Sequence, residues 1–186
     1  MAAKQNPVTL SVDPGTTQSA YVMMRADYSI ISAAKVDNEE LRQLIMMGGA
    51  DELAIECMEP RHLQNGMIGE ETYGTCYWIG RYMECAQRLG MPVHRIYRVE
   101  ERSRIIPSKK NRLPALPAWA GKSADAQIRA ALIQRFARHD KKNGKGTSKC
   151  KDVFYGFAKD VWNAYAVGVV HLDKRAEEAR KAALGG

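Results

Sequence analysis

Acidic side chains end several apolar segments of this chain. Asp13 follows an apolar, β-branched run and precedes a Pro-Gly turn, so it lies at the end of a predicted strand. Glu56 ends a second apolar run, where a charge must face solvent, a counter-charge or a metal. Asp160 and Asn163 are three residues apart at the start of the last predicted helix, which places them on one face. Oxygen ligands of this kind suit Mg²⁺ or Mn²⁺, so these four residues form a candidate metal site.

The segment from Asp13 to Thr17 is open to three interpretations. It could supply a metal ligand in a nuclease, or an Asp that caps a turn before Pro-Gly. It is also similar to the Asp-x-Gly-Thr-Thr phosphate loop of the sugar-kinase, actin and chaperone-ATPase superfamily. That superfamily closes two such domains around a nucleotide. Because the 186 residues supply one such domain and no second phosphate loop, the ATPase or kinase interpretation is disfavoured.

The charge distribution favours a nucleic-acid partner. The chain has 28 Lys and Arg against 21 Asp and Glu, a formal net charge of +7, and an excess of this sign attracts phosphate. Positive charges cluster between residues 95 and 151, whereas residues 37–59 are mainly acidic, which indicates one binding face. The candidate DNA-binding residues are Arg102, Arg104, Lys109, Lys110, Arg112 and Lys122.

Other patterns narrow the class of protein. No apolar run approaches the ~20 residues that a membrane span requires, and residues 1–7 do not resemble a secretory signal. We therefore expect a cytoplasmic protein with no membrane partner and no small-molecule cofactor. The cysteines lack CxxC spacing and a paired histidine motif, so core or surface roles are expected rather than a structural zinc site. They are Cys57, Cys76, Cys85 and Cys150.

The expected architecture is α/β, a mixed five-stranded sheet flanked by helices, in one domain over residues 1–186. The first three strands form an antiparallel meander. Strands are predicted at 8–13, 19–25, 28–36, 52–57 and 92–99, and helices at 37–47, 70–89, 122–138 and 158–180. Flexible loops are predicted at about 58–68, 107–121 and 140–151.

The helix predicted at 70–89 has two apolar stripes, which indicates either a core on both sides or contact with a second copy. A homodimer joined through this helix is therefore expected, with Trp78 and Tyr82 in the contact. One stripe contains Tyr73, Cys76, Tyr77, Gly80 and Met83, and the other contains Trp78, Tyr82, Cys85 and Leu89.

Four segments, in order, resemble motifs of RuvC-type Holliday-junction resolvases of the ribonuclease H-like superfamily. Leu10–Gly15 is similar to the first-strand motif, and Leu53–Glu56 to the second acidic motif. Gly121–Ile128 resembles the start of a conserved helix, and Lys159–Gly168 resembles the carboxy-terminal Asp-x-x-Asp-Ala-x-Ala helix. The resemblance spans roughly residues 8 to 172.

The resemblance implies a ribonuclease H-like fold and a metal-dependent crossover junction endodeoxyribonuclease, a hydrolase acting in DNA recombination and repair. It implies two Mg²⁺ ions per site, with Mn²⁺ as a substitute, held by Asp13, Glu56 and Asp160 together with Asn163. One ion would activate water for in-line attack, and the other would stabilise the leaving 3′ oxygen. Lys122 matches a basic position of the family that would stabilise the scissile phosphate. Symmetric nicks in a four-way junction would require a homodimer.

Two departures from the family pattern leave alternatives open. Asn163 stands where the family usually has a second Asp: this lineage tolerates Asn, Asp152 substitutes for it, or the chain is an inactivated variant. After Glu56 the family often has an aromatic wedge, but this chain has Cys57 and Met58. Met58 or His62 could stack on a base instead. The alternatives are an endonuclease for other branched DNA and a catalytically weakened junction-binding module. His171 is expected to pack within its helix, with general-base catalysis as the lesser possibility.

Overall fold

A five-stranded mixed sheet forms the centre of the computed structural model, which describes residues 6–59, 69–109, 111 and 113–185. The strand order is β3-β2-β1-β4-β5. β1, β2 and β3 are antiparallel neighbours, whereas β4 pairs parallel with β1, and β5 pairs parallel with β4. This arrangement confirms the predicted mixed sheet with an antiparallel meander. The strands are β1 (Val8–Asp13), β2 (Gln18–Arg25), β3 (Ile30–Asp37), β4 (Glu52–Cys57) and β5 (Val93–Tyr97).

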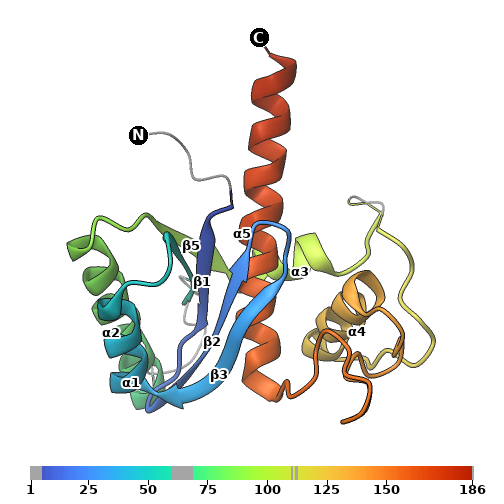
Figure 1. Ribbon diagram of the computed structural model, residues 1–186, viewed down its shortest axis with the longest axis horizontal. Helices are drawn as coiled ribbons and strands as arrows, with labels where there is room; N and C mark the ends of the chain where they lie inside the picture. The colour runs from blue at the N-terminus through green and yellow to red at the C-terminus, as the bar shows by residue number, and fades with distance from the viewer. Residues whose placement is uncertain (1–5, 60–68, 110, 112, 186) are drawn as a thin grey trace.

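Helices cover both faces of the sheet. Figure 1 shows α1 and α2 on one face, α5 along the other, and α4 on the far side of α5. The helix over Arg98–Ile105 was not predicted, because it has few apolar residues and so lacks a helical hydrophobic repeat. The helices are α1 (Asn38–Met47), α2 (Glu70–Arg88), α3 (Arg98–Ile105), α4 (Ala124–Phe136) and α5 (Lys159–Leu184).

Alternation along the strands divides the core into two halves. Leu10 and Val12 of β1 pack with the α1 and α2 side, while Ala54 of β4 packs with the α5 side. α5 lies close on the sheet at Gly168, where a Cβ atom would be 2.8 Å from Oγ of Ser11. Strand residues that alternate in sequence with those of the α1–α2 side therefore point toward α5. These residues form a stripe along the strands, the stripe that faces α5, and its two ends lie near the two ends of the sheet.

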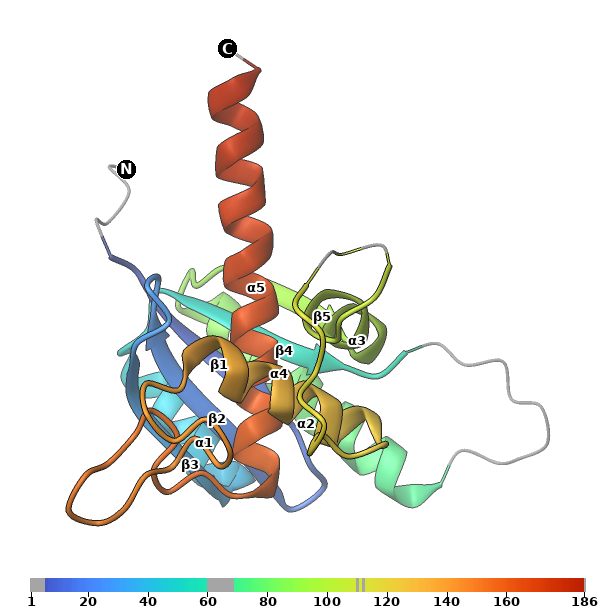
Figure 2. The same ribbon diagram turned by 90° about the vertical axis from the view of Figure 1, so that its right-hand side faces the viewer.

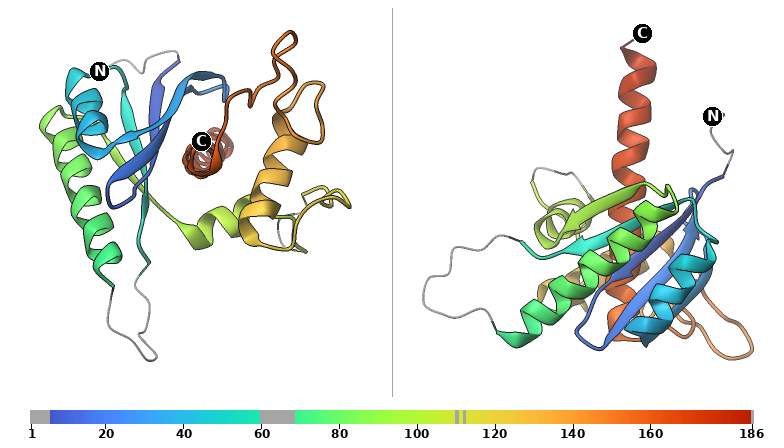
Figure 3. Two further views of the ribbon diagram at one scale, coloured as in Figure 1. Left: turned by 90° about the horizontal axis from the view of Figure 1, so that it is seen from below. Right: turned by 90° about the vertical axis from the view of Figure 1, so that its left-hand side faces the viewer.

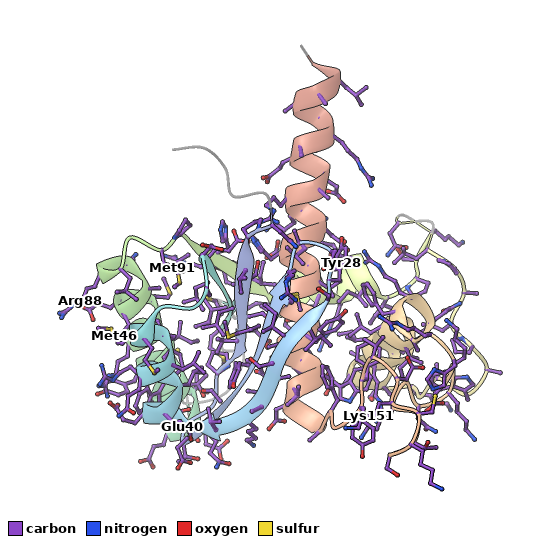
Figure 4. All side chains as sticks on the ribbon, viewed as in Figure 1. Tyr28, Glu40, Met46, Arg88, Met91 and Lys151 are labelled. Carbon is purple, nitrogen blue, oxygen red and sulfur yellow. The ribbon has the colours of Figure 1, made fainter. Side chains whose placement is uncertain are left out.

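The β2–β3 connection starts the third strand later than predicted. Tyr28 has a φ of 67°, so it belongs to the turn rather than to a strand. Its hydroxyl donates a 2.6 Å hydrogen bond to Asp173 of α5, and its ring is 5.2 Å from that of Phe136 of α4. Figure 4 shows Tyr28 beside α5. The turn thus ties the meander to both helices.

α2 buries the middle of one of its two apolar stripes, Tyr82 and Cys85, inside the chain. Tyr82 has no exposed surface, and its hydroxyl contacts Oγ of Ser19 at 3.1 Å. The expectation that Tyr82 contacts a second copy is therefore wrong, because its side chain fills the core between α2 and the sheet. In the other stripe, Tyr73 and Tyr77 are 62% and 59% exposed.

The long connections differ in how far the structure describes them. The predicted loop at 58–68 lies mostly outside the described residues, and 107–121 contains no helix or strand among its described residues. Flexibility of the 140–151 loop stays a prediction. Within it, Asp140 accepts hydrogen bonds from the backbone of Asn143, Lys145 and Gly146, which form a turn over residues 140–146. Lys151, at the end of this loop, lies on the surface (Figure 4).

The last turns of α5 extend beyond the rest of the described chain, as Figures 1 and 2 show. Leu184, near its end, is 89% exposed. Seen from below, α5 lies between the sheet and α4 (Figure 3). Within the described residues, none of the helices has the length and apolar character needed to cross a bilayer.

Candidate metal centre

Strand pairing brings Asp13 and Glu56 to one edge of the sheet. β1 and β4 are parallel neighbours, and Val12 pairs with Ile55, so the two acids that follow lie side by side. Both alternate with core residues of the α1–α2 side and therefore face α5. α5 begins over this edge, with Asp160 and Asn163 in its first turns. The strand register and the start of α5 thus place the four predicted ligands near the same end of the sheet, where parallel strands end and where α/β sheets usually place their sites.

The acidic cluster carries more negative charge than its surroundings balance. Burial raises the pKa of Asp13 to about 8, and the charges of Glu56 and Asp160 act in the same direction. The nearby side chain of Asn163 opposes this rise in the pKa of Asp13. Burial also raises the pKa of Glu56, although Arg98 opposes this shift. A divalent cation would supply the missing positive charge, so these oxygen donors fit Mg²⁺ or Mn²⁺.

A hollow of about 300 Å³ opens beside the cluster. Asp13 and Asp160 line it together with the turn from Pro14 to Gln18. Lys35 of β3 also lines it, and its Nζ lies 2.6 Å from Oδ2 of Asp160. Both side chains of this ion pair are partly exposed, at 44% and 37%, and such pairs contribute only about 0–1 kcal/mol. A metal ion could therefore displace Lys35 from Asp160 at low cost, and a phosphate could draw Lys35 away from Asp160.

Arg98 and Glu101 of α3 also belong to the charged groups around this cluster, and neither was predicted from the sequence. Glu101 has no exposed surface, and its Oε1 lacks a hydrogen-bond partner among the described residues. Burial raises the pKa of Glu101 to about 9, aided by the charge of Glu56 and opposed by Arg98. Arg98 also pairs with Asp125 of α4. The only sequence signal for them was their position directly after β5, at the same edge of the sheet as Asp13.

The predicted DNA-binding residues have different surroundings. Lys122 is exposed, just before Ser123, which caps α4 by accepting a hydrogen bond from the backbone of Ala126. Arg102 and Lys109 are also exposed. Arg104 is half-buried and pairs with Glu177 of α5 at 3.0 Å, so its charge is already balanced. The two remaining candidates, Lys110 and Arg112, lie outside the described residues, as does His62.

Asp152 lies apart from the cluster and does not substitute for Asn163. Its carboxylate accepts hydrogen bonds from the backbone N–H groups of Arg138, His139, Asp140 and Val153. Burial alone would raise the pKa of Asp152, but these donors outweigh it and hold the pKa well below its usual range. Asp152 therefore organises the connection between α4 and α5.

His171 also lies apart from Asp13. It follows Asn163 by eight residues, about 12 Å along a helix, and its Nε2 is 3.0 Å from Oε1 of Glu52, at the start of β4. A role as general base beside Asp13 is therefore not supported by its position.

Comparison with known proteins gives structural but not sequence matches. No family model matches the chain, and no curated protein matches it in sequence. A solved structure of T. thermophilus RuvC in complex with a Holliday junction substrate covers 91% of this chain and 96% of its own, with a TM-score of 0.57 and 12% identity. The fold is RuvC-like.

A second structure of Thermus thermophilus RuvC matches with a TM-score of 0.55, the same identity and the same coverage. The ribonuclease H-like fold predicted from the sequence is therefore confirmed, and the structural likeness to RuvC agrees with the resemblance carried by the four motifs. At 12% identity the likeness establishes the fold alone.

Proposed function

We propose that this chain is a metal-dependent endonuclease that resolves four-way DNA junctions. One observation carries the proposal: Asp13 and Glu56 end neighbouring parallel strands of a RuvC-like sheet, and α5 begins with Asp160 and Asn163 beside a hollow that Asp13 and Asp160 line. A divalent cation requires carboxylate ligands, and carboxyl groups with raised pKa values concentrate at functional sites.

Each residue of the cluster has a different role in binding the cation. The pKa values of Asp13 and Glu56 are both raised in the absence of a cation, and both groups must be ionised to bind one. Asp160 must exchange Lys35 for the cation, and Asn163 offers a neutral amide oxygen. Two bound Mg²⁺ ions, or Mn²⁺ ions, would activate a water and stabilise the leaving oxygen of the phosphodiester.

Exposed basic side chains supply the DNA contacts in this proposal. Arg102, Lys109 and Lys122 would bind backbone phosphate, which gives affinity that falls steeply with salt. Lys122 precedes the amino terminus of α4, where backbone N–H groups also favour phosphate. Lys110 and Arg112 belong to the same basic segment of the sequence. The T. thermophilus RuvC structure contains a Holliday junction substrate, so a ligand of this shape is the first to test.

Symmetric nicking requires two active sites, and we propose a homodimer formed through α2. The exposed stripe with Tyr73 and Tyr77 supplies aromatic surface for this contact. Trp78 is half-buried against Tyr82 and contributes at the edge of the stripe.

The decisive assay uses a labelled, mobile four-way junction with Mg²⁺ or Mn²⁺, and maps the nicks on all four strands. We expect paired nicks on opposite strands, lost in Asp13→Asn and retained in Asp27→Asn, which removes an exposed carboxylate in the β2–β3 turn. Cleavage that Asp13→Asn leaves unchanged would overturn the assignment of this site. Preference for flaps or three-way junctions would instead identify another branched-DNA endonuclease.

A catalytically weakened junction-binding module is the second candidate. The ion pair between Lys35 and Asp160 favours it, because a lysine neutralises one of the acids that would hold a metal. Asn163 removes a further negative charge. Tight junction binding without nicks, persisting in Asn163→Asp at saturating Mn²⁺, would identify the module.

A further inference from the structure

A second polar cluster lies at the other end of the stripe that faces α5. Glu52 begins β4, His94 is on β5, and His171 is on α5. Nε2 of His171 is 3.0 Å from Oε1 of Glu52, and Nε2 of His94 is 3.3 Å from Oε2. One potential ligand atom of each residue lies within 4.8 Å of the other two. Three donors on three elements thus converge on one point.

Two imidazole nitrogens of the cluster lack hydrogen-bond partners among the described residues. Nε2 of His94 and Nε2 of His171 are buried without a hydrogen bond, although each lies close to a carboxylate oxygen of Glu52. His171 is only 4% exposed, and Glu52 only 8%. A buried polar atom without a partner is unfavourable, so the geometry leaves both nitrogens directed at an unfilled interaction.

The two histidines are also in direct contact with each other. Their rings stack with centroids 4.1 Å apart, and two imidazolium charges at that distance would repel each other. Neutral imidazole, which carries no such cost, is the form that binds metals.

Two hydrogen-bond donors other than the histidines hold the carboxylate of Glu52 in place. Oε1 accepts hydrogen bonds from Oγ1 of Thr9 and from Nη1 of Arg175, both at 2.6 Å. Contacts of this kind orient the ligands of metal sites. Oε2 remains directed toward His94. A hollow of about 410 Å³, lined by both histidines together with Lys174, Arg175 and Glu178, gives an ion access from solvent.

We propose that Glu52, His94 and His171 bind one divalent ion of the zinc class, separate from the Mg²⁺ site. Two imidazoles and one carboxylate select Zn²⁺, Co²⁺ or Ni²⁺ over Mg²⁺, which prefers oxygen ligands. Three protein ligands leave a fourth position for solvent from the hollow. The ion would join β4, β5 and α5 and so fix α5 on the sheet. The inference does not depend on the proposed nuclease activity.

The test measures retention of Zn²⁺ by the full chain in excess Mg²⁺, by equilibrium dialysis and metal analysis. We expect one equivalent of Zn²⁺, with affinity reduced by more than about 100-fold in His94→Ala, since even outer contacts of metal ligands contribute 10- to 100-fold. The side chain of His94 is 37% exposed, so this variant should fold. Glu52→Gln should lose the ion as well. Failure of the wild type to retain Zn²⁺ would overturn the proposal.

Two matched variants separate this site from others. His139 and Cys150 lie 3.6 Å apart on the surface and could bind zinc, so His139→Ala must leave retention unchanged. Asp13→Asn alters the other site and must also leave it unchanged, even if it abolishes nicking. Loss of zinc in either variant, or equal retention in His94→Ala, would place the ion elsewhere.

Two further measurements report on the ligands themselves. Co²⁺ in this site should give a visible spectrum without a thiolate charge-transfer band, because no cysteine takes part; a strong thiolate band would contradict the assignment. Arg175→Gln removes a hydrogen bond that orients Glu52 and leaves the three donors in place. It should weaken Zn²⁺ binding less than His94→Ala does, and a larger loss than in His94→Ala would contradict the assignment of the ligands.

Discussion

Nζ of Lys35 lies 2.6 Å from Oδ2 of Asp160 and joins β3 to the first turn of α5 at the candidate metal centre. A cation and a lysine compete for the same carboxylate there. A Lys35 variant therefore distinguishes two cases. In one, the cluster binds a metal ion that competes with Lys35 for Asp160; in the other, Lys35 has permanently taken the place of the ion.

Lys35→Gln should lower the Mg²⁺ concentration needed for half-maximal nicking by roughly 5- to 10-fold, because the ion no longer displaces a salt bridge worth about 0–1 kcal/mol or meets a nearby positive charge. The measurement is a metal titration of junction nicking. Lys149→Gln, an exposed lysine in the 140–151 loop, is the control. A higher Mg²⁺ requirement in Lys35→Gln would show that Lys35 acts in catalysis.

Stability without metal should fall as pH rises. The pKa of Asp13 is raised to about 8, so the folded protein holds this proton more tightly than the unfolded chain does. The stabilisation is complete below the usual carboxyl range and is lost as pH rises through about 8. Thermal melts in EDTA should therefore show a lower Tm at alkaline pH, and Mg²⁺ should restore more stability there than at acidic pH.

Asp13→Asn should flatten that dependence and raise the metal-free Tm at alkaline pH by a few degrees, since Asn cannot ionise. A Tm that falls equally with pH in the variant would assign the effect to other groups, Glu56 and Glu101 first.

Asn163→Asp should raise Mg²⁺-dependent nicking by about 10-fold or more, because it adds a charged ligand to the ion that Asn163 serves. Without metal the same change should lower the Tm, since a further negative charge would lie against Asp13, whose pKa is already raised. Nicking rates at saturating Mg²⁺ and melts in EDTA measure the two effects. Unchanged or lower nicking would remove Asn163 from the metal site.

Arg98→Gln should shift the pH–rate profile of nicking to higher pH by about one unit, because Arg98 opposes the rise in the pKa of both Glu56 and Glu101. Arg98→Lys keeps the positive charge and should shift the profile less. A profile that does not move in Arg98→Gln, with the protein folded by circular dichroism, would separate Arg98 from the titration of the site.

Tyr73→Glu should weaken self-association through α2 and abolish paired nicking while single nicks persist, because a charge in an apolar contact is costly to bury. Sedimentation velocity and nick mapping test this, with Glu84→Gln, on an exposed part of α2, as the control. A monomeric wild type that still nicks in pairs would contradict the proposed dimer.

The sequence determined the strands and the acids that end them. Apolar runs stop at Asp13 and near Glu56, and parallel strands place such ends at one edge, so the core of the candidate site followed from local pattern. The start of α5 added Asp160 and Asn163 because their helical spacing is fixed. Repeating patterns also identified the four longer helices, whereas the polar eight-residue α3 has no such repeat.

Tertiary structure alone decided the partners of these groups. Lys35 lies beside Asp160 because strand pairing places β3 next to β2 and α5 packs on the same face of the sheet. Glu101 becomes buried only when α3 packs against α5 and α4. Glu52, His94 and His171 are separated by 42 and 77 residues in the sequence, so no spacing rule joins them. They meet because strand register and the close packing of α5 at Gly168 fix which side chains face each other along the same stripe.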